Sequence, residues 1–266
     1  MLVENKKAVI FGGSGAIGGA VARALVRAGA TIYLVARHQD KLEEIAKEIR
    51  EIGGKVETYC IDVLDAEATN EQVAHLAQKS GGIDIVINAT GFMHNQGKLI
   101  SELSLNEFMQ GITPFLTAQF NIAKAVTPYM GGERSGVIIS IVAPSGVMAI
   151  PGHLGHIVGC AGVEAFNKAL ASELGSKNIR VICVRSHAIV DAIQAGSYTR
   201  EVFEAKALAM GITVEQWLGG AAQSTMLHHL PTLSEVAETI TFLASDHASA
   251  ITATVMNMTA GATLSG

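Results

Sequence analysis

Short apolar runs alternate with amphipathic segments along the chain of 266 residues. The runs are predominantly apolar and several are rich in Val and Ile, which is typical of strands buried on both faces of a parallel sheet. The segments between them repeat their apolar residues at helical spacing. We therefore predict an α/β fold, a single Rossmann-type doubly wound parallel sheet with helices on both faces. The predicted strands are 8–11, 31–35, 55–61, 83–87, 137–142, 180–184 and 254–258, and the predicted helices follow the first strand and then span 41–52, 66–79, 105–112, 116–130, 155–174 and 236–244.

The segment 188–230 departs from this alternation because it is long, mostly helical in character and weakly patterned. Long excursions after a strand of an α/β domain are often functional. We therefore predict one domain over 1–266, with a substrate lid inserted at about 188–230. Large apolar side chains in the lid favour an apolar small-molecule substrate, although they would equally pack the lid against the body or a neighbour. They are Met210, Trp217, Leu218, Met226 and Leu227.

The first predicted strand runs into glycines at positions 12, 13, 15, 18 and 19, and a helical pattern follows at once. Gly12 can take backbone angles that a Cβ forbids. The free N–H groups of the first helical turn also attract an anion. We therefore predict a diphosphate-binding turn, and a tight turn without a ligand is the alternative. The residues that would bind are Gly12, Ser14, Ile17 and Gly18.

Charge and cysteine content limit the partners and the compartment. The formal net charge is −5 with scattered Lys and Arg, which argues against binding to nucleic acid or to an anionic membrane. Residues 135–163 carry no charge, but prolines and histidines interrupt them, so we predict no membrane span. An odd number of cysteines and no signal pattern predict a reduced, cytoplasmic protein. We attribute the low charged fraction, 16%, to a buried subunit interface.

Six short motifs occur in an order and at a spacing that are specific when taken together. They are Gly12-x-x-x-Ala16-Ile17-Gly18, Asp62-Val63, Asn88-Ala-Thr-Gly91, Ala169-Leu-Ala-x-Glu173-Leu, Ile179-Arg-Val181 and the tail 251–258. On these motifs the chain resembles the short-chain dehydrogenase/reductase (SDR) family along nearly its whole length. The resemblance implies an oxidoreductase that uses a nicotinamide dinucleotide. It also implies a homotetramer (or dimer) built on the helices 116–130 and 155–174 and on the last strand.

The residue that follows the second strand bears on the choice of dinucleotide. Dinucleotide folds usually carry an acidic residue there to hold the ribose 2′-hydroxyl, whereas this chain has Arg37. A guanidinium without a carboxylate suits a 2′-phosphate and favours NADP(H) over NAD(H). A solvated arginine at a helix start is the alternative. By resemblance, Asp62 accepts a hydrogen bond from the adenine and Val63 packs on its ring, although Asp62 would also cap the next helix. The residues that would line the ribose are Asn88, Ala89 and Gly91.

The catalytic residues of the family have no counterparts at the expected positions. SDR enzymes use an Asn, a Ser and a Tyr-x-x-x-Lys, in which the Tyr moves the proton, the Lys supports it and the Ser polarises the carbonyl. Counted without gaps from the flanking motifs, the residues at these positions are Phe115 (Asn), Ala143 (Ser), His156 (Tyr) and Cys160 (Lys). All four have changed chemical type, so the standard proton relay is absent.

Nearby histidines offer a replacement acid. His153, His156 and Cys160 share one face of a predicted helix, and His187 is expected near the same pocket. Because an imidazole is a competent general acid or base, we predict that His156 donates the proton. Ser145 or His187 would then polarise the carbonyl. Alternatively, His156 and Cys160 only fill space, or they bind zinc together with His153. That spacing matches no zinc signature, so we predict no metal site.

Three functions remain open on these observations. The first is an NADP-dependent oxidoreductase that uses His156 on a hydrophobic carbonyl or alcohol. The second is a catalytically inactive relative that binds a dinucleotide or assembles with partners, and the third is a non-redox isomerase or lyase. Asp191 stands where the family often has a cofactor-contacting Thr, and would weaken cofactor binding unless Arg185 pairs with it. The glycine turn and Arg37 favour the first function over the third, and we adopt the first as our prediction.

Overall fold

The computed structural model describes residues 1–264, without the side chain of Ala209. A seven-stranded parallel sheet lies at its centre, with the strand order β3-β2-β1-β4-β5-β6-β7. The order reverses between β1 and β4, which is where open parallel sheets of this kind form their ligand crevice. The strands are β1 Lys7–Phe11, β2 Thr31–Ala36, β3 Val56–Cys60, β4 Ile85–Asn88, β5 Gly136–Val142, β6 Ile179–Ser186 and β7 Thr254–Met258.

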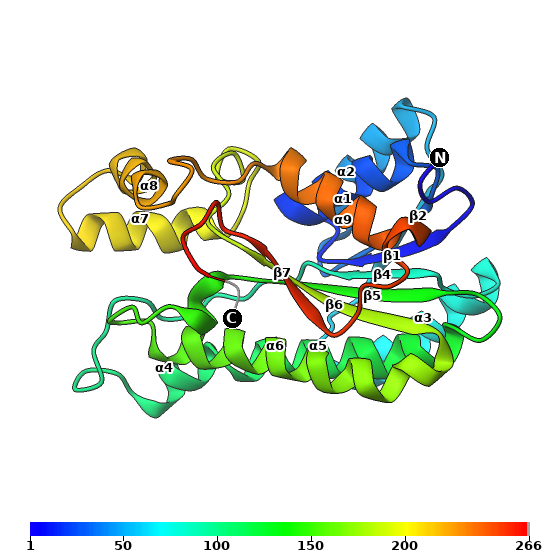
Figure 1. The fold of residues 1–266 in the computed structure, drawn as a ribbon, viewed down its shortest axis with the longest axis horizontal. Coiled ribbons are helices and arrows are strands. Elements are labelled where there is room, and N and C mark those ends of the chain that lie inside the picture. The colour runs from blue at the N-terminus through cyan, green and yellow to red at the C-terminus, as the bar shows by residue number, and fades with distance from the viewer. Residues whose placement is uncertain (265–266) are drawn as a thin grey trace.

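Helices cover both faces of the sheet, as Figure 1 shows. Side chains alternate between the faces along each strand. Ile10 and Leu34 therefore pack with α1, α2 and α9, whereas Val9 and Val35 pack with α3, α5 and α6. The predicted Rossmann-type doubly wound fold is confirmed. The helices are α1 Ala16–Arg27, α2 Gln39–Glu51, α3 Ala66–Ser80, α4 Leu105–Gln110, α5 Thr113–Val126, α6 Leu154–Leu174, α7 Thr199–Ala209, α8 Val214–Gln223 and α9 Leu233–Ala244, with the short 3-10 turns η1 Thr127–Tyr129, η2 Pro144–Val147, η3 Gly175–Lys177 and η4 Asp246–Ala248.

Glycines let the start of α6 lie directly against the end of α4. A Cβ added to Gly111 would lie 2.5 Å from the carbonyl carbon of Gly155, and one added to Gly159 would collide with the carbonyl oxygen of Gly111. The chain turns at Ile112, so α4 and α5 are separate helices. This close crossing holds the amino-terminal half of α6 beside η2, directly after β5.

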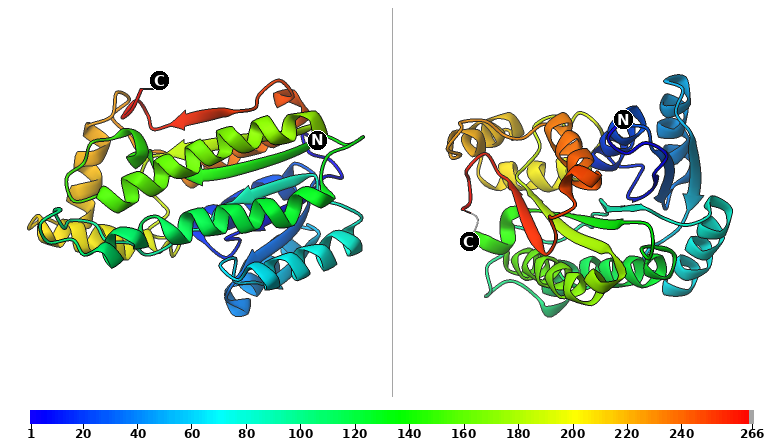
Figure 2. Two further views of the ribbon diagram at one scale, coloured as in Figure 1. Left: turned by 90° about the horizontal axis from the view of Figure 1, so that it is seen from below. Right: turned by 45° about the vertical axis from the view of Figure 1, so that its right-hand side comes forward.

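Helices α5 and α6 run side by side under the sheet, which is clearest from below (Figure 2). Their outer surface carries exposed apolar side chains. Phe120 on α5 is 53% exposed, and Leu154 and Val158 on α6 are 42% and 41% exposed. Exposed apolar residues grouped on two adjacent helices are typical of a surface that another subunit covers.

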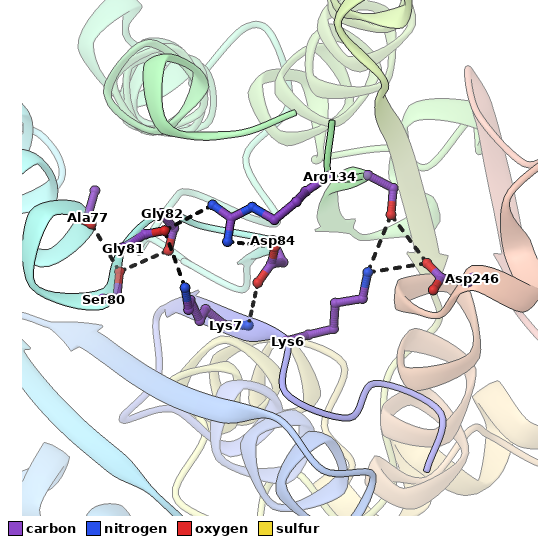
Figure 3. Close-up of polar contacts among 10 residues, drawn as sticks. Lys6, Lys7, Ala77, Ser80, Gly81, Gly82, Asp84, Arg134 and Asp246 are labelled. Atoms are coloured by element: carbon purple, nitrogen blue, oxygen red, sulfur yellow. Dashed lines mark hydrogen bonds and ion pairs between the residues drawn. The ribbon is translucent and has the colours of Figure 1, made fainter. Parts of the chain in front are cut away.

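A polar cluster ties the amino-terminal ends of three strands together (Figure 3). Oδ2 of the buried Asp84 accepts a hydrogen bond of 2.9 Å from the backbone N–H of Lys7, and its other oxygen lies 3.9 Å from Arg134. Lys6 contacts both Ser135 and Asp246, at 3.4 and 3.3 Å. These contacts fix the entry into β1 and β5. They lie away from the carboxyl-terminal edge of the sheet, where a cavity described below is located.

Helices α7 and α8 lie beyond that carboxyl-terminal edge, far from the amino terminus of the chain (Figure 1). They come from the excursion that sequence periodicity left weakly defined, and they pack on each other through a Phe203–Trp217 ring pair with centroids 4.5 Å apart. Among the residues that the structure describes, no helix has the length and apolar content needed to cross a membrane.

The close crossing of α4 and α6 predicts a large effect of one methyl group. Gly159→Ala should lower the free energy of unfolding by about 1–3 kcal/mol or more, because the collision is with backbone rather than with a flexible side chain. Gly219→Ala on the exposed face of α8 meets nothing within 4 Å, so it should be neutral or stabilising. Urea unfolding of both variants measures the difference, and equal stability of the two would contradict this packing.

Candidate active site

The turn between β1 and α1 approaches the chain after β4 very closely. Gly12 has φ +77°, and its backbone N–H donates to the carbonyl oxygen of Val35 at 2.9 Å. A Cβ on Gly12 would lie 2.5 Å from the carbonyl oxygen of Ala89, and one on Gly18 would collide with the carbonyl oxygen of Gly12. Gly12 is therefore required by contact as well as by backbone angle, and Gly18 is required by contact.

The amino terminus of α1 has the features of an anion site. Gly15 is the N-cap and offers no side-chain acceptor, and the first turn of the helix contains no acidic residue. The first N–H groups are therefore free to meet a ligand, and the helix dipole favours a negative one. Ser14 immediately precedes the cap and Ile17 lies in the first turn. These features are compatible with a diphosphate group, and the diphosphate site predicted from the sequence stays a prediction.

The residues expected at the adenosine end lie after β2 and β3. Arg37 follows the last residue of β2 and is exposed. Asp62 is exposed after β3, where its Oδ1 accepts a hydrogen bond of 3.0 Å from the backbone N–H of Leu64. Asp65, rather than Asp62, caps α3. Val63 is buried in the core on the sheet face that α3, α5 and α6 cover, so little of its side-chain surface is left for contact with a ligand.

A buried network positions the turn after β4. Nδ2 of Asn88 donates to Gln119 at 2.6 Å, and its Oδ1 accepts from the hydroxyl of Thr90 at 2.7 Å. Nε2 of Gln119 donates in turn to Ser140 at 2.6 Å and to Asn167 at 2.9 Å. Asn88 therefore supports the turn toward Gly91 from below. Gln119 and Asn167 escaped the sequence analysis because polar residues inside amphipathic helices give no periodic signal.

One cavity of about 330 Å³ extends from the predicted catalytic residues to three of the predicted cofactor residues. Ile17, Ala89 and Gly91 line it from the dinucleotide side, and His156, Ser145 and His187 line it from the other. The four positions aligned with the family's catalytic residues all face this cavity, which supports their gap-free alignment. They are Phe115, Ala143, His156 and Cys160. The other predicted cofactor residues, Gly12, Ser14, Gly18, Arg37, Asp62, Val63 and Asn88, lie outside its lining.

His156 is a neutral imidazole in this environment. Its ring stacks on that of His94, with centroids 3.9 Å apart and 12° between the planes, and Phe115 lies at 5.9 Å. Burial, followed by the nearby His94, lowers the pKa of His156 to about 3. Protonating such a group at pH 7 would cost about 5 kcal/mol. His156 therefore cannot act as a resident imidazolium, and the role open to it is that of a neutral N–H hydrogen-bond donor.

Cys160 does not replace the charge of the family's lysine. Its Sγ lies 3.6 Å from Nε2 of His156, and burial raises the pKa of the thiol to about 12. The thiol stays protonated and uncharged at neutral pH. Phe115, at the Asn position, packs edge-on against Phe92 with ring centroids 5.3 Å apart. The part of the cavity wall around these residues is consequently apolar.

Hydrogen bonds fix the tautomers of two further histidines of the cavity wall, His153 and His187. Nδ1 of His153 donates to the carbonyl oxygen of Pro151 at 2.9 Å, which leaves its Nε2 as an acceptor for Lys206 at 3.2 Å. Both nitrogens of His153 are thus engaged, which disfavours a zinc site shared with His156 and Cys160. Within residues 1–264 no group of three His, Cys, Asp or Glu is arranged to hold a metal ion. Nδ1 of His187 accepts from the backbone N–H of Ala188 at 2.7 Å, so its Nε2 carries the proton.

Two titratable residues of the segment 188–230, Tyr198 and Lys206, are among those that line the cavity, and the sequence analysis missed both. The hydroxyl end of Tyr198 is buried against Gly91, where a Cβ would lie 2.6 Å from Oη, although 38% of the whole residue is exposed. Burial raises the pKa of Tyr198 to about 12. Lys206 lies on α7, and its ammonium points at His153. Because the hydrophobic pattern of residues 188–230 is weak, the sequence did not indicate where either side chain would lie.

Arg185 does not pair with Asp191, which is the contact that would have kept Asp191 from weakening cofactor binding. Arg185 instead makes a bidentate pair with Glu164 on α6, with both hydrogen bonds at 2.8 Å. Asp191 accepts from the backbone N–H of Leu233 at 2.9 Å. The amino terminus of α9 satisfies this carboxylate, because helix N–H groups and the helix dipole both stabilise a negative charge there. Asp191 is therefore held by the protein itself and not aimed at a cofactor.

Comparisons with known proteins identify the family. A family model for short chain dehydrogenases matches residues 6–200, and the chain belongs to this family. A 3-oxoacyl-[acyl-carrier-protein] reductase of Thermotoga maritima is 29% identical over 98% of this chain and 99% of its own. A 2,3-dihydro-2,3-dihydroxybenzoate dehydrogenase of Bacillus subtilis is 30% identical over 98% of this chain and 97% of its own. The structure of an NAD+-bound xylitol dehydrogenase shares the fold, with a TM-score of 0.87, 21% identity and coverage of 98% and 100%.

The low pKa of His156 predicts a stability that depends on pH. The unfolded chain binds a proton at this residue below about pH 6.5, whereas the folded chain does not bind it until about pH 3. The free energy of unfolding should fall as the pH decreases through this window, by up to about 1.4 kcal/mol per pH unit from this residue.

Urea unfolding between about pH 7 and pH 5 measures this slope. His156→Phe should make the slope shallower, and His247→Gln, at an exposed histidine, should leave it unchanged. A slope that is the same in His156→Phe and in the wild type would contradict the burial of a neutral His156.

Proposed function

We propose that this chain is an NADP(H)-dependent oxidoreductase that acts on a hydrophobic carbonyl or alcohol, with His156 in the place of the family's tyrosine. The observation that carries the proposal is the single cavity in which Ile17 and Gly91, from the dinucleotide side, meet His156. The relatives support the reaction class, because one is a reductase and another a dehydrogenase. A bound nicotinamide would supply the hydride chemistry.

The chain's own residues divide the remaining work. Gly12, Ser14, Ile17 and Gly18 would hold the diphosphate, because the cradle that they form has free N–H groups and no room for a Cβ. Ala89 and Gly91 would line the ribose on the turn that Asn88 supports. Asp62 retains one carboxylate oxygen without a partner among the described residues, and with Val63 it would meet the adenine.

The proposal of NADP(H) rather than NAD(H) rests on Arg37. The guanidinium is exposed directly after β2, and no ion pair with a carboxylate of residues 1–264 occupies it. A 2′-phosphate there would form charge-assisted hydrogen bonds at little cost in desolvation. The NAD+-bound xylitol dehydrogenase shows that the fold by itself also accommodates NAD+. The local charge at this position is therefore what supports the choice.

Substitution of Arg37 tests the choice of dinucleotide. Arg37→Ala should weaken NADPH binding about 10- to 100-fold, since hydrogen bonds to a charged group contribute about 1.5–3 kcal/mol. NADH binding should hardly change. Titration followed by nicotinamide fluorescence measures both, and Arg27→Ala at the far end of α1 is the matched control. Equal losses for NADPH and NADH, or no binding of either by the wild type, would contradict the proposal.

His156 would act on the substrate oxygen as a neutral donor. Its N–H would hydrogen-bond to the carbonyl oxygen while Ser145 or His187, which line the same cavity, supplies a second contact. Nε2 of His187 carries the proton needed for this, because Nδ1 already accepts from Ala188. A neutral imidazole is a weaker acid than imidazolium, but it can polarise a carbonyl without the cost of a buried charge.

Carbonyl reduction by purified variants tests this role. His156→Phe keeps an aromatic ring against His94 but removes both ring nitrogens, so it should lower kcat by about 10²- to 10⁴-fold with NADPH binding preserved. His75→Phe, at an exposed position on α3, should retain wild-type activity. Full activity in His156→Phe together with a loss in Tyr198→Phe would show instead that the lid supplies the proton.

A catalytically inactive dinucleotide-binding protein is the second candidate. Two observations favour it. Cys160 provides no positive charge at the lysine position, and Tyr198 covers Gly91 on the wall expected to meet the cofactor ribose. This candidate gains support if NADPH binds but a broad panel of ketones, aldehydes and alcohols shows no turnover.

The lid, the assembly and the compartment complete the proposal. Residues 188–230 would act as a substrate lid over the single domain, because α7 and α8 supply part of the cavity wall. The exposed apolar residues of α5 and α6 support a homotetramer or dimer built on these helices. We place the protein in the cytoplasm, where the free thiols of Cys160 and Cys183 would stay reduced.

A further inference from the structure

Lys206 is the one formally charged side chain among the described residues that line the cavity. Asp, Glu and Arg are absent from the same lining. Nζ of Lys206 lies 3.2 Å from Nε2 of His153 and 4.9 Å from the centre of the Trp217 ring. Both contacts fix the position of the ammonium, and neither neutralises it.

The histidines around Lys206 contribute no charge of their own. Burial is the largest cause of the lowered pKa values of His153, His156 and His187, and the charge of Lys206 lowers all three further. The cavity therefore holds one positive charge without a counter-ion from its own wall. Burial also lowers the pKa of Lys206, and no carboxylate within residues 1–264 opposes that effect. An unpaired charge at a partly buried site is costly, and an anionic ligand would remove that cost.

The walls around the ammonium are apolar and aromatic. Phe203 packs against Trp217, over whose ring Lys206 lies, and Met148, Ile150 and Val202 line the same cavity. Such a wall stabilises a hydrocarbon or aromatic body by burying it. A ligand that satisfies both features has an apolar body and a single anionic group.

We propose that the cavity binds a small apolar or aromatic acid, and that Lys206 binds its carboxylate. One ammonium matches one carboxylate in charge, whereas a phosphate dianion would leave an excess negative charge among apolar walls. Because His153 takes one of the three N–H groups of Lys206, two remain for the two oxygens of a carboxylate. The proposal deepens the proposed function, since it names the substrate class of that site.

Lys206 also offers a readout that does not depend on catalysis. Trp217 is the single tryptophan of the chain and lies against the ammonium, so its fluorescence reports a ligand bound at Lys206. The probes are 3-phenylpropionate and its neutral amide, 3-phenylpropionamide, which share one carbon skeleton. Titration without nicotinamide cofactor keeps this test separate from the proposed redox activity.

The wild type should bind the carboxylate about tenfold or more tightly than the amide, because the salt-bridged hydrogen bonds exist only with the acid. Lys206→Met should bring the two affinities close together. Lys206→Arg should keep most of the preference, which protects the test if the Met variant folds poorly. Arg200→Met is the matched control, since it removes a positive charge from the same helix where that charge pairs with Glu204 outside the cavity.

Three results would overturn the proposal. They are equal affinity of the wild type for acid and amide, a preference that survives in Lys206→Met, and a preference that is lost equally in Arg200→Met. Parallel NADPH titrations separate the two proposals. If Lys206→Met weakens NADPH but leaves the acid preference unchanged, Lys206 serves a cofactor phosphate instead. If the acid preference behaves as expected but the wild type does not bind NADPH, the proposed redox function fails and acid binding stands.

Discussion

Desolvation at the carboxyl-terminal edge of the sheet governs the chemistry of this protein. The segment 188–230, the start of α6 and the turn after β4 together bury the titratable side chains that line one cavity. Burial disfavours every charged form. It keeps His156 neutral, keeps Cys160 as a thiol and lowers the pKa of Lys206. His156 and Cys160, which align with the family's tyrosine and lysine, are therefore uncharged, and Lys206 supplies the one formal charge among the described lining residues.

This environment separates the two halves of the site. The dinucleotide half depends on backbone geometry, because Gly12 and Gly18 permit contacts that no other residue allows. The dinucleotide proposed above would use this half, although Tyr198 covers Gly91 in the present structure. The reactive half depends on side chains, and there the gap-free alignment sets His156 and Cys160 at the positions of the family's tyrosine and lysine, beside the stacked ring of His94 and an apolar wall.

The fold was predictable because its signals are local. Apolar strands such as 180–184 and glycine turns such as the one at Gly12 carry their meaning within a few residues, and only element ends shifted. Gap-free counting also placed Phe115 and Cys160 correctly on one cavity wall. Tyr198 and Lys206 were not predictable, because the position of a lid side chain depends on how α7 docks across the sheet edge. The Arg185–Glu164 pair was missed because its partners lie on two separate elements, β6 and α6, whose relative placement the sequence does not give.

A crystal structure of the protein saturated with NADPH would test the central claim most directly. We expect the diphosphate on the turn from Gly12 to Gly18, the 2′-phosphate at Arg37, and the nicotinamide inside the cavity that His156 lines. The nicotinamide carbon that transfers the hydride should then lie about 3–3.5 Å from the place of a substrate's carbonyl carbon. In that place the carbonyl oxygen should be within hydrogen-bond reach of the imidazole. A nicotinamide held outside the cavity, with Tyr198 still covering Gly91, would contradict an oxidoreductase that works through His156.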